Sequence, residues 1–562
     1  MRTLLLLLLS VIVAGFLACT AGKQYDLVIR NGVIYDGGGG EPYAGDIAID
    51  GDTIVALGDI GAASGAEEID AGGLAVAPGF INILSWANES LIEDGRSQSD
   101  IRQGVTLEVL GEGWSMGPVS EEMLDQLPLQ QTEITYEVEW RTLGEYLDYL
   151  AERGVSCNVA SFVGATSCRI YVIGYEDRQA TPEELEQMRA LVREAMEEGA
   201  VGLSTALEYV PAIFAETEEI IALAAVASDY GGLYISHMRD EGDSIFEALD
   251  EFLRIAREAN IRAEIYHLKV AGESNWPLLD EVFKRIEAAR AEGLQITADM
   301  YPYTAGATNL SASLPPWSLE GGMEATRERL QDPAVRRRII EQLRGSEWQG
   351  FYRAAGAEGI MLTGFKQEEL RGLIGMRLSE VAQERGTSPE DTLIDMLLED
   401  ESPINAVYFL MNEEQVARKM AQPWVCFGSD EASLAPEGVF LKANPHPRAY
   451  GTFARVLGKY VRDEGVLTLP EAIRRMTTLP ASTLKLERRG ALEEGNFADI
   501  VVFDPAKIQD HATFDRPHQY STGVVHVFVN GEQVLKDGEH TGATPGRVVR
   551  GPGWTGAAER EE

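Results

Sequence analysis

Basic residues, cysteines, histidines and long apolar runs are all scarce in this chain of 562 residues. Lys and Arg number 48 against 90 Asp and Glu, so the formal net charge is −42. This balance disfavours nucleic acid as a partner, because nucleic-acid binding requires a basic surface. We interpret the excess of acid as a solvated surface that aids solubility. Past the first twenty or so residues no apolar run reaches about eighteen residues, so we expect no transmembrane helix in the mature protein.

Cysteine is also rare, with four residues in the whole chain. Cys157, Cys168 and Cys426 all lie in or beside apolar runs. This placement predicts buried free thiols rather than a framework of disulfides.

Residues 1–21 have the pattern of a secretory signal peptide. A charged start is followed by an apolar core too short to span a bilayer comfortably. Ala18-Cys19 resembles a bacterial lipoprotein cleavage site, which would make 1–18 the signal and leave a lipidated Cys19 as a membrane tether. The alternative is simple secretion with cleavage near Ala21. Both alternatives predict an exported protein, periplasmic or at the cell surface, and nothing in the sequence predicts a protein partner.

Both ends of the remaining chain, residues 24–78 and 485–545, have a β pattern with glycine turns. Asn31-Gly32, between alternating apolar residues, predicts a hairpin. A similar pattern returns at 498–504 and at 524–529. We predict a small β-sandwich domain built from both termini. The Gly-rich and charged tail after Gly542 is expected to be frayed.

The middle of the chain, residues 79–484, alternates apolar strand-like runs with helical patterns. Thr181, followed by proline and two glutamates, predicts a helix that runs to about Glu198. Eight such alternations predict an α/β fold, a TIM-like (β/α)8 barrel, with an insertion at about 310–420. The apolar runs begin near Phe80, Val105, Asn158, Val201, Leu233, Arg262, Gln295 and Trp424.

Four chemically active side chains lie where these strands are expected to end. Only 7 histidines occur, yet His237 and His267 each close a short apolar run. Glu112 and Asp430 follow two other runs. Because the carboxyl ends of barrel strands meet at the face that carries the active site, these residues predict a divalent metal site, with zinc as the first candidate. The alternative is that the histidines are ordinary core residues.

Several segments, in this order along the chain, resemble the amidohydrolase superfamily and, within it, the N-acyl-D-amino-acid deacylases (D-aminoacylases). The resemblance covers nearly the whole mature chain. It implies a metal-dependent hydrolase that cleaves the amide bond of N-acyl-D-amino acids to a D-amino acid and a carboxylate. The segments are 77–81, 202–209, 236–239, 267–269, 301–303, 428–430, 446–453 and 490–504.

Two positions depart from this resemblance. The superfamily usually carries His-x-His just after the first strand, where this chain has Leu84-Ser85-Trp86. Glu112 stands where D-aminoacylases commonly have a cysteine ligand. We therefore expect about one zinc ion per chain, held by Glu112, His237 and His267.

The same residues suggest how the reaction would proceed. Asp430 is the predicted base, which takes the proton from the attacking water and hands it to the leaving amine. Lys269 shares a strand face with His267 and is predicted to bind the substrate's carboxylate. The competing view is that Lys269 pairs with a neighbouring acid such as Glu273.

Other substrate contacts depend on the resemblance. It assigns Tyr209 and Tyr301 as substrate-contacting hydroxyls, with core packing as the alternative. The family often has an arginine after its Tyr-Pro-Tyr segment, and none follows Tyr303 before Trp317 here. Arg239 and Arg448 are the candidate replacements, with surface or ion-pair roles as the alternative.

Three functions remain open at this point. The first is the deacylase. The second is hydrolysis of a cyclic amide or of a small peptide with D-residues. The third is a catalytically inactive binding lipoprotein, which the retention of Glu112, His237, His267 and Asp430 argues against. All three have a small-molecule ligand.

Overall fold

The structure of the chain is a computed structural model, which describes residues 23–345 and 350–556. The predicted signal peptide and Cys19 lie outside the described residues. Within the described part, no helix is both long and apolar enough to cross a membrane. Cys157, Cys168 and Cys426 are buried free thiols, as predicted.

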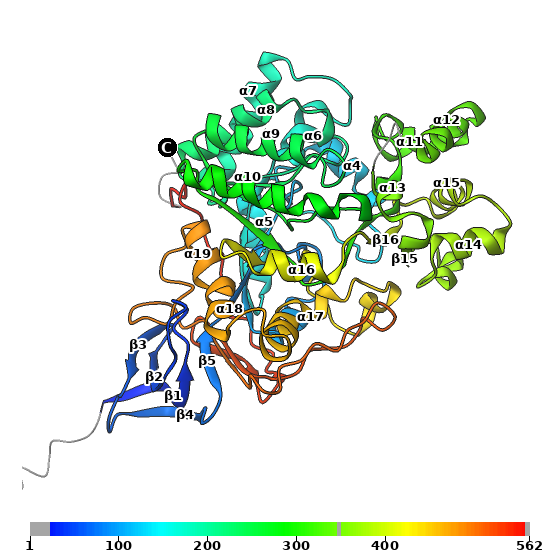
Figure 1. Cartoon of the computed structure of the whole chain (residues 1–562). Helices are drawn as coiled ribbons and strands as arrows, with labels where there is room; N and C mark the ends of the chain where they lie inside the picture. The colour runs from blue at the N-terminus through cyan, green and yellow to red at the C-terminus, as the bar shows by residue number, and fades with distance from the viewer. Residues whose placement is uncertain (1–22, 346–349, 557–562) are drawn as a thin grey trace, which may run out of the picture.

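Eight parallel strands close a barrel and confirm the predicted fold class (Figure 1). One part of the wall is β6-β7-β8, and the other is β17-β13-β12-β11-β10-β9. Only Phe162 separates β8 from the short β9 (Val163–Gly164), and a parallel bridge between Ser85 and Glu431 closes the other side. The eight are β6 (Phe80–Asn82), β7 (Val105–Leu110), β8 (Asn158–Ser161), β10 (Gly202–Ala206), β11 (Leu233–His237), β12 (Arg262–Ile265), β13 (Ile296–Met300) and β17 (Val425–Phe427).

Helices cover the outside of the barrel, so its strands are buried on both faces. The predicted helix after Thr181 is α7, and its N-terminus has a capping box in which the Thr181 and Glu184 side chains each bond the other's backbone N–H. The covering helices are α3 (Gln98–Ile101), α5 (Leu143–Arg153), α6 (Ala165–Ile173), α7 (Pro182–Glu197), α8 (Thr217–Asp229), α9 (Ile245–Glu258), α10 (Leu279–Ala291), α16 (Glu413–Met420), α17 (Arg448–Arg455), α18 (Leu469–Met476) and α19 (Thr478–Leu484).

Both ends of the chain share one nine-stranded sheet beside the barrel, whose N-terminal strands are blue in Figure 1. The two ends join where β18 pairs antiparallel with β5. Apolar residues from both ends, such as Ile29, Val76 and Ile500, form its core. The strands are β1 (Gln24–Ile34), β2 (Tyr43–Asp50), β3 (Thr53–Gly58), β4 (Ser64–Asp70), β5 (Ala75–Pro78), β18 (Ile500–Phe503), β19 (Val524–Val529), β20 (Glu532–Lys536) and β21 (Glu539–His540).

The prediction of a hairpin at Asn31-Gly32 was wrong. These residues lie inside the continuous strand β1, where the pairing with β2 shifts register between Ile29 and Gly32. Asn31 has φ +58°, a value that asparagine tolerates, and the irregularity is a bulge rather than a turn. By contrast, Asn530-Gly531 does connect the antiparallel strands β19 and β20.

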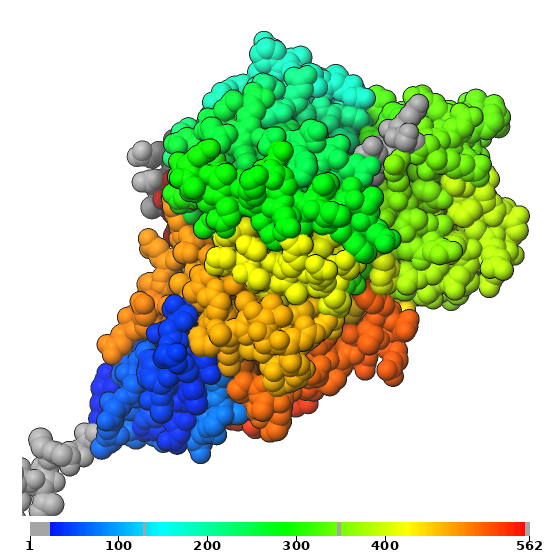
Figure 2. All heavy atoms as spheres, in the orientation of Figure 1, coloured from blue at the N-terminus to red at the C-terminus, as the bar shows by residue number. Residues whose placement is uncertain are grey.

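The insertion forms a lobe that projects from the barrel (yellow-green in Figure 2). Its base is a small antiparallel sheet in the order β14-β16-β15, which begins at Ala305. This sheet lies over the carboxyl ends of the barrel strands and lines the pocket there. Its elements are β14 (Ala305–Asn309), α11 (Gly322–Gln331), α12 (Pro333–Arg344), α13 (Phe351–Ala355), β15 (Ile360–Gly364), α14 (Leu378–Arg385), α15 (Pro389–Asp400) and β16 (Asn405–Phe409).

The tail after Gly542 is ordered against the barrel up to residue 556, which corrects the expectation that it frays. The backbone N–H of Val549 bonds the carbonyl of Val159 at 2.8 Å, and that of Gly551 bonds the carbonyl of Gly199 at 2.8 Å. At Gly546 an added Cβ would lie 1.9 Å from the carbonyl oxygen of Cys157, so only glycine permits this approach. Glycine in this segment therefore serves close packing rather than flexibility.

Candidate active site

The barrel brings the four predicted side chains to one face. His237 is the last residue of β11, and His267 follows β12. Glu112 follows β7 and Asp430 follows β17. All four are buried, with Asp430 the most exposed at 7%. Strand ends remote in sequence therefore meet as the sequence predicted.

Glu112, His237 and His267 present three donor atoms to one point. Oε1 of Glu112 lies 3.2 Å from Nδ1 of His237 and 2.9 Å from Nε2 of His267. Their ligand atoms all lie within 4.8 Å of one another. Burial alone would raise the pKa of Glu112, but the two imidazoles hold it well below its usual range. One carboxylate and two imidazoles are a donor set that suits a catalytic divalent ion, because further coordination positions stay open.

The second carboxylate oxygen of Glu112 is held by Trp86, a residue that the sequence indicated only as the loss of a histidine ligand. Nε1 of Trp86 donates a hydrogen bond of 2.8 Å to Oε2 of Glu112. Trp86 thus takes a place beside the metal ligands without being one itself.

Two of the four residues have unusual backbone conformations. His267 has φ +35° and Asp430 has φ +52°, values that residues other than glycine rarely adopt. Hydrogen bonds hold both: the N–H of His267 donates to Oδ1 of Asp299 at 2.9 Å, and the N–H of Asp430 to the Leu84 carbonyl at 2.8 Å. Such strain is typical of residues whose orientation is functional.

Two carboxylates behind the histidines escaped the sequence analysis. Nε2 of His237 lies 3.1 Å from Oε2 of Glu208 and 3.7 Å from Oε2 of Glu241. Nδ1 of His267 lies 3.2 Å from Oε1 of Glu241. Carboxylates on the outer nitrogens fix the tautomer and orientation of metal-binding imidazoles. The signals available were the place of Glu208 in segment 202–209 and the position of Glu241 four residues after His237.

Lys269 pairs with an acid, as the competing view held, but with Glu241 rather than Glu273. Its Nζ lies 2.8 Å and 2.7 Å from the two oxygens of Glu241. Burial opposes the charge on Lys269, yet Glu241 raises the pKa of the ammonium above its usual value. The ammonium also lies 2.7 Å from Nδ1 of His267, so Lys269 and Glu241 together support the imidazole.

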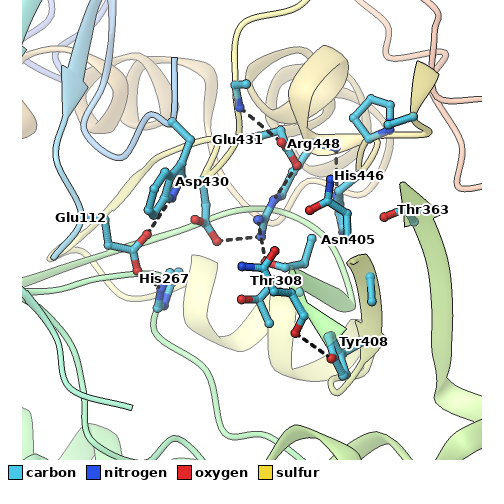
Figure 3. Close-up of a pocket in the computed structure, with 18 of the residues that line it drawn as sticks. Glu112, His267, Thr308, Thr363, Asn405, Tyr408, Asp430, Glu431, His446 and Arg448 are labelled. Carbon is cyan, nitrogen blue, oxygen red and sulfur yellow. Dashed lines mark hydrogen bonds and ion pairs between the residues drawn. The ribbon is translucent and has the colours of Figure 1, made fainter. Parts of the chain in front are cut away.

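Of the two candidate arginines, Arg448 is the one that lines the pocket (Figure 3). Its Nη1 lies 2.6 Å from Oδ2 of Asp430, and its guanidinium lies 4.5 Å from the ring centre of Tyr301. Burial raises the pKa of the Asp430 carboxyl, and Arg448 opposes that rise. The Tyr301 hydroxyl is buried and has no hydrogen-bond partner within the described part of the chain. An unpartnered hydroxyl beside a buried guanidinium is a favourable arrangement for a carboxylate ligand.

Arg239 does not lie in the pocket, which corrects its assignment as a substrate-binding residue. Its guanidinium bonds both oxygens of Glu251 at 2.8 Å and the carbonyls of Ile213 and Ala215 at 2.8 and 3.0 Å. These contacts occupy the N–H donors of the guanidinium in structural interactions, which agrees with the alternative of an ion-pair role.

The pocket above the four strand-end residues is a cavity of about 530 Å³. Tyr209 lines it, edge-on to His237 with ring centres 4.9 Å apart, and stacks on Phe351 of the insertion. Thr308, Thr363, Asn405 and Tyr408 from the small sheet form the wall opposite Glu112 and His267 (Figure 3). The cavity therefore has one wall with metal-binding chemistry and another with neutral polar groups.

Comparison with known proteins agrees with this geometry. Residues 67–535 match the model of the Amidohydrolase family. The chain belongs to the amidohydrolase family. This amidohydrolase is 36% identical over 528 residues to a D-aminoacylase of Alcaligenes xylosoxydans xylosoxydans, a match that covers 94% of this chain and 98% of the relative. It is also 36% identical to an N-acyl-D-aspartate deacylase of the same organism, over 94% of this chain and 96% of the relative.

A solved structure is similar along most of the chain. N-acyl-D-glutamate deacylase from Bordetella bronchiseptica, complexed with zinc and a phosphonate mimic of the tetrahedral intermediate, has a TM-score of 0.78 at 29% identity. The match covers 94% of this amidohydrolase and 100% of that chain. The barrel and its accompanying β domain are thus shared by this amidohydrolase and a zinc-containing deacylase.

Proposed function

We propose that this amidohydrolase is a zinc-dependent deacylase that cleaves the amide bond of N-acyl-D-amino acids. The observation that carries the proposal is the single oxygen of Glu112 that faces both Nδ1 of His237 and Nε2 of His267. The deacylase names of its relatives support both the substrate class and its D configuration. An inactive binding protein would have no use for such a ligand set beside a buried carboxylate.

Glu112, His237 and His267 would hold the ion. A second group of possible ligands, Glu208, His237 and Glu241, shares His237 with this set. Leu84-Ser85-Trp86 in place of His-x-His supports about one ion per chain. When bound, such an ion supplies Lewis-acid activation of a water molecule and of the scissile carbonyl. Glu208, Glu241 and the pair that Glu241 forms with Lys269 keep both imidazoles oriented with the required nitrogen toward the site.

Asp430 moves the proton in this proposal. Its carboxylate accepts a proton from the attacking water and returns it to the nitrogen of the leaving amine, whose bond to the acyl carbon breaks. Burial raises the pKa of Asp430, which favours a base that can also give the proton back.

The substrate's carboxylate is proposed to bind Arg448 and the Tyr301 hydroxyl. Both side chains are at most 3% exposed and lie on the pocket wall next to Asp430. This replaces Lys269, whose ammonium is engaged by Glu241, as the principal carboxylate ligand. Tyr209 is proposed to contact the substrate through its position in the cavity wall.

The test is a panel of N-acetyl-D- and N-acetyl-L-amino acids with the zinc-loaded enzyme, read by release of the free amino acid. Hydrolysis restricted to the D series is expected. Cyclic amides, such as hydantoins, and short D-residue peptides run in the same panel. Turnover of cyclic amides alone would replace the proposal with the second function, and no turnover together with a failure to bind zinc would favour the third.

We also propose export, with residues 1–18 as a lipoprotein signal and Cys19 as the lipidated residue; simple secretion with cleavage near Ala21 is the alternative. The support is the pattern of the first residues alone. In cell fractionation, the full chain is expected in the membrane fraction and a Cys19→Ser variant is expected to be lost from it. Equal distribution of both proteins would favour simple secretion.

A further inference from the structure

The cavity is lined by two acids besides those of the metal site, and this inference rests on the proposed deacylase function. A Cβ added at Gly364 of β15 would lie 3.2 Å from Oε1 of Glu133, so this acid borders the small sheet opposite the metal ligands. Glu89 precedes the short helix α2 (Ser90–Glu93), and Glu133 lies in the segment after α4 (Glu121–Gln130). Both line the cavity of about 530 Å³, together with the neutral side chains of Asn309, Thr363 and Asn405. A substrate longer than its amide and carboxylate would therefore meet these groups.

The cations of the cavity lie elsewhere and are already engaged. Among the described residues that line it, the lysine and arginine side chains are those of Lys269 and Arg448. Lys269 is held by both oxygens of Glu241, and Arg448 lies 2.6 Å from Asp430. Once Arg448 has bound the substrate's carboxylate, no lysine or arginine of the described cavity lining remains for a second negative group.

The carboxylate oxygens of the two acids, by contrast, accept few hydrogen bonds or none from the described residues. Oε1 of Glu133 is buried and accepts no hydrogen bond from the described residues, while its other oxygen accepts one from Oγ1 of Thr132. Oε1 of Glu89 accepts a hydrogen bond of 2.8 Å from the Tyr136 hydroxyl. Within residues 23–345 and 350–556, neither acid forms an ion pair with a basic side chain. Lys366 lines a smaller hollow that Glu133 also borders, but it forms no ion pair with Glu133.

The charge of Glu133 also disfavours the charge of Glu89. Burial raises the pKa of Glu89, the hydrogen bond from Tyr136 opposes the rise, and the charge of Glu133 adds to it. A cation between them would remove both the repulsion and the unmade hydrogen bond. The overall charge of −42 would in addition attract a cationic molecule to the cavity.

From these contacts we infer that the preferred substrate carries a cationic group at the end remote from the scissile amide, and that Glu133, with Glu89, binds it. The cation can belong to the side chain of the D-amino acid or to the acyl group, since both extend from the amide into the cavity. The chemistry is the same in each case: an ammonium or guanidinium group meets a half-buried carboxylate. An acidic side chain at this wall would meet like charge.

The experiment compares matched substrates with and without the cation. N-acetyl-D-lysine is paired with N-acetyl-D-norleucine, and 6-aminohexanoyl-D-norleucine with hexanoyl-D-norleucine. In at least one pair, kcat/KM is expected to be about tenfold or more higher for the cationic member, the size of a hydrogen bond to a charged group. The pair that shows the preference identifies whether the side chain or the acyl group reaches Glu133.

The variant Glu133→Gln keeps the shape of the side chain and removes its charge. The ratio of kcat/KM within the preferred pair is expected to fall about tenfold, toward unity, whatever general effect the substitution has. Glu137→Gln, an exposed acid of the same segment outside the cavity wall, is the control and should leave the ratio unchanged.

Three results would overturn the inference. They are equal kcat/KM within both pairs, a ratio insensitive to Glu133→Gln, or a preference for N-acetyl-D-glutamate over all four substrates. In each of them hydrolysis of the neutral substrates persists, so the deacylase proposal stands. Absence of hydrolysis with every N-acyl-D-amino acid would instead reject the deacylase proposal.

Discussion

Nε1 of Trp86 donates a hydrogen bond of 2.8 Å to Oε2 of Glu112, while Oε1 of the same carboxylate faces His237 and His267. Trp86 is the last residue of the triplet that stands in place of His-x-His. The indole N–H therefore fixes the carboxylate that binds one ion, and the indole has no lone pair with which to bind a second ion.

The first prediction is a metal content of about one divalent ion per chain. Elemental analysis of dialysed protein is the measurement. Trp86→Phe, which removes the indole donor, is expected to weaken the binding of this ion without adding another. Two ions at full occupancy in the unmodified protein would mean that a second ligand set exists.

The second prediction separates metal binding from chemistry at Asp430. Asp430→Asn keeps the side-chain shape but removes the base, so turnover is expected to fall by roughly two orders of magnitude or more. Zinc content should stay close to that of the unmodified enzyme. In contrast, His267→Ala should lose both zinc and activity. Near-normal turnover in Asp430→Asn would require another base.

The third prediction concerns Glu241 and Lys269. Glu241→Gln and Lys269→Met are each expected to lower zinc affinity by about 10- to 100-fold, since they remove the support of the two imidazoles. Competition with a chelator measures the affinity directly. Glu247→Gln, at an exposed position of α9, serves as the control. If Lys269→Met left zinc affinity unchanged but impaired only substrates with a carboxylate, Lys269 would be a substrate ligand after all.

The fourth prediction concerns Arg448. Arg448→Met is expected to lower kcat/KM for N-acyl-D-amino acids by roughly a hundredfold, because it removes the buried partner of the substrate's carboxylate. The loss should be much smaller for the corresponding C-terminal amides, which have no carboxylate. Equal losses on both kinds of substrate would restrict Arg448 to the support of Asp430.

The fifth prediction is a pH dependence of stability caused by Lys419 on α16. This side chain is 1% exposed, and its Nζ donates a hydrogen bond of 3.3 Å to Sδ of Met411. Burial, aided by the charge of Lys269, lowers the pKa of Lys419 from 10.5 to about 7. A lowered pKa means that the stability associated with the neutral amine is present above about pH 10.5 and is lost as the pH falls toward 7.

Lys419→Met is therefore expected to raise the free energy of unfolding at neutral pH by about 1 to 3 kcal/mol. It should also flatten the dependence of that free energy on pH between 7 and 10.5. Denaturant unfolding at several pH values measures both effects. A destabilised variant would show that the Lys419 ammonium has a partner that compensates its burial.

Much of the fold and the centre of the site were predictable because they depend on local order along the chain. Strand-like runs recur with helices between them, and His237, His267, Glu112 and Asp430 each follow such a run. In a parallel barrel the end of every strand reaches the same face, so position relative to a strand is sufficient to predict proximity. The capping box at Thr181 is local in the same sense.

Other features depended on contacts between segments remote in sequence, which no local pattern encodes. Lys269 was predicted to bind the substrate's carboxylate and Arg239 was a candidate to do so, but Lys269 pairs with Glu241 and Arg239 with Glu251. Asn31-Gly32 became a bulge because β2 pairs with β1 on both sides of it, from Leu27 to Ile34. The tail beyond Gly542 is ordered because the barrel offers it a backbone to pair with. The sequence by itself determined which chemical groups exist and which strand ends carry them. Only the tertiary structure decided which hydrogen-bond and ion-pair partners these groups have. The reason is that a buried charge must be matched by whichever group the packing brings within reach.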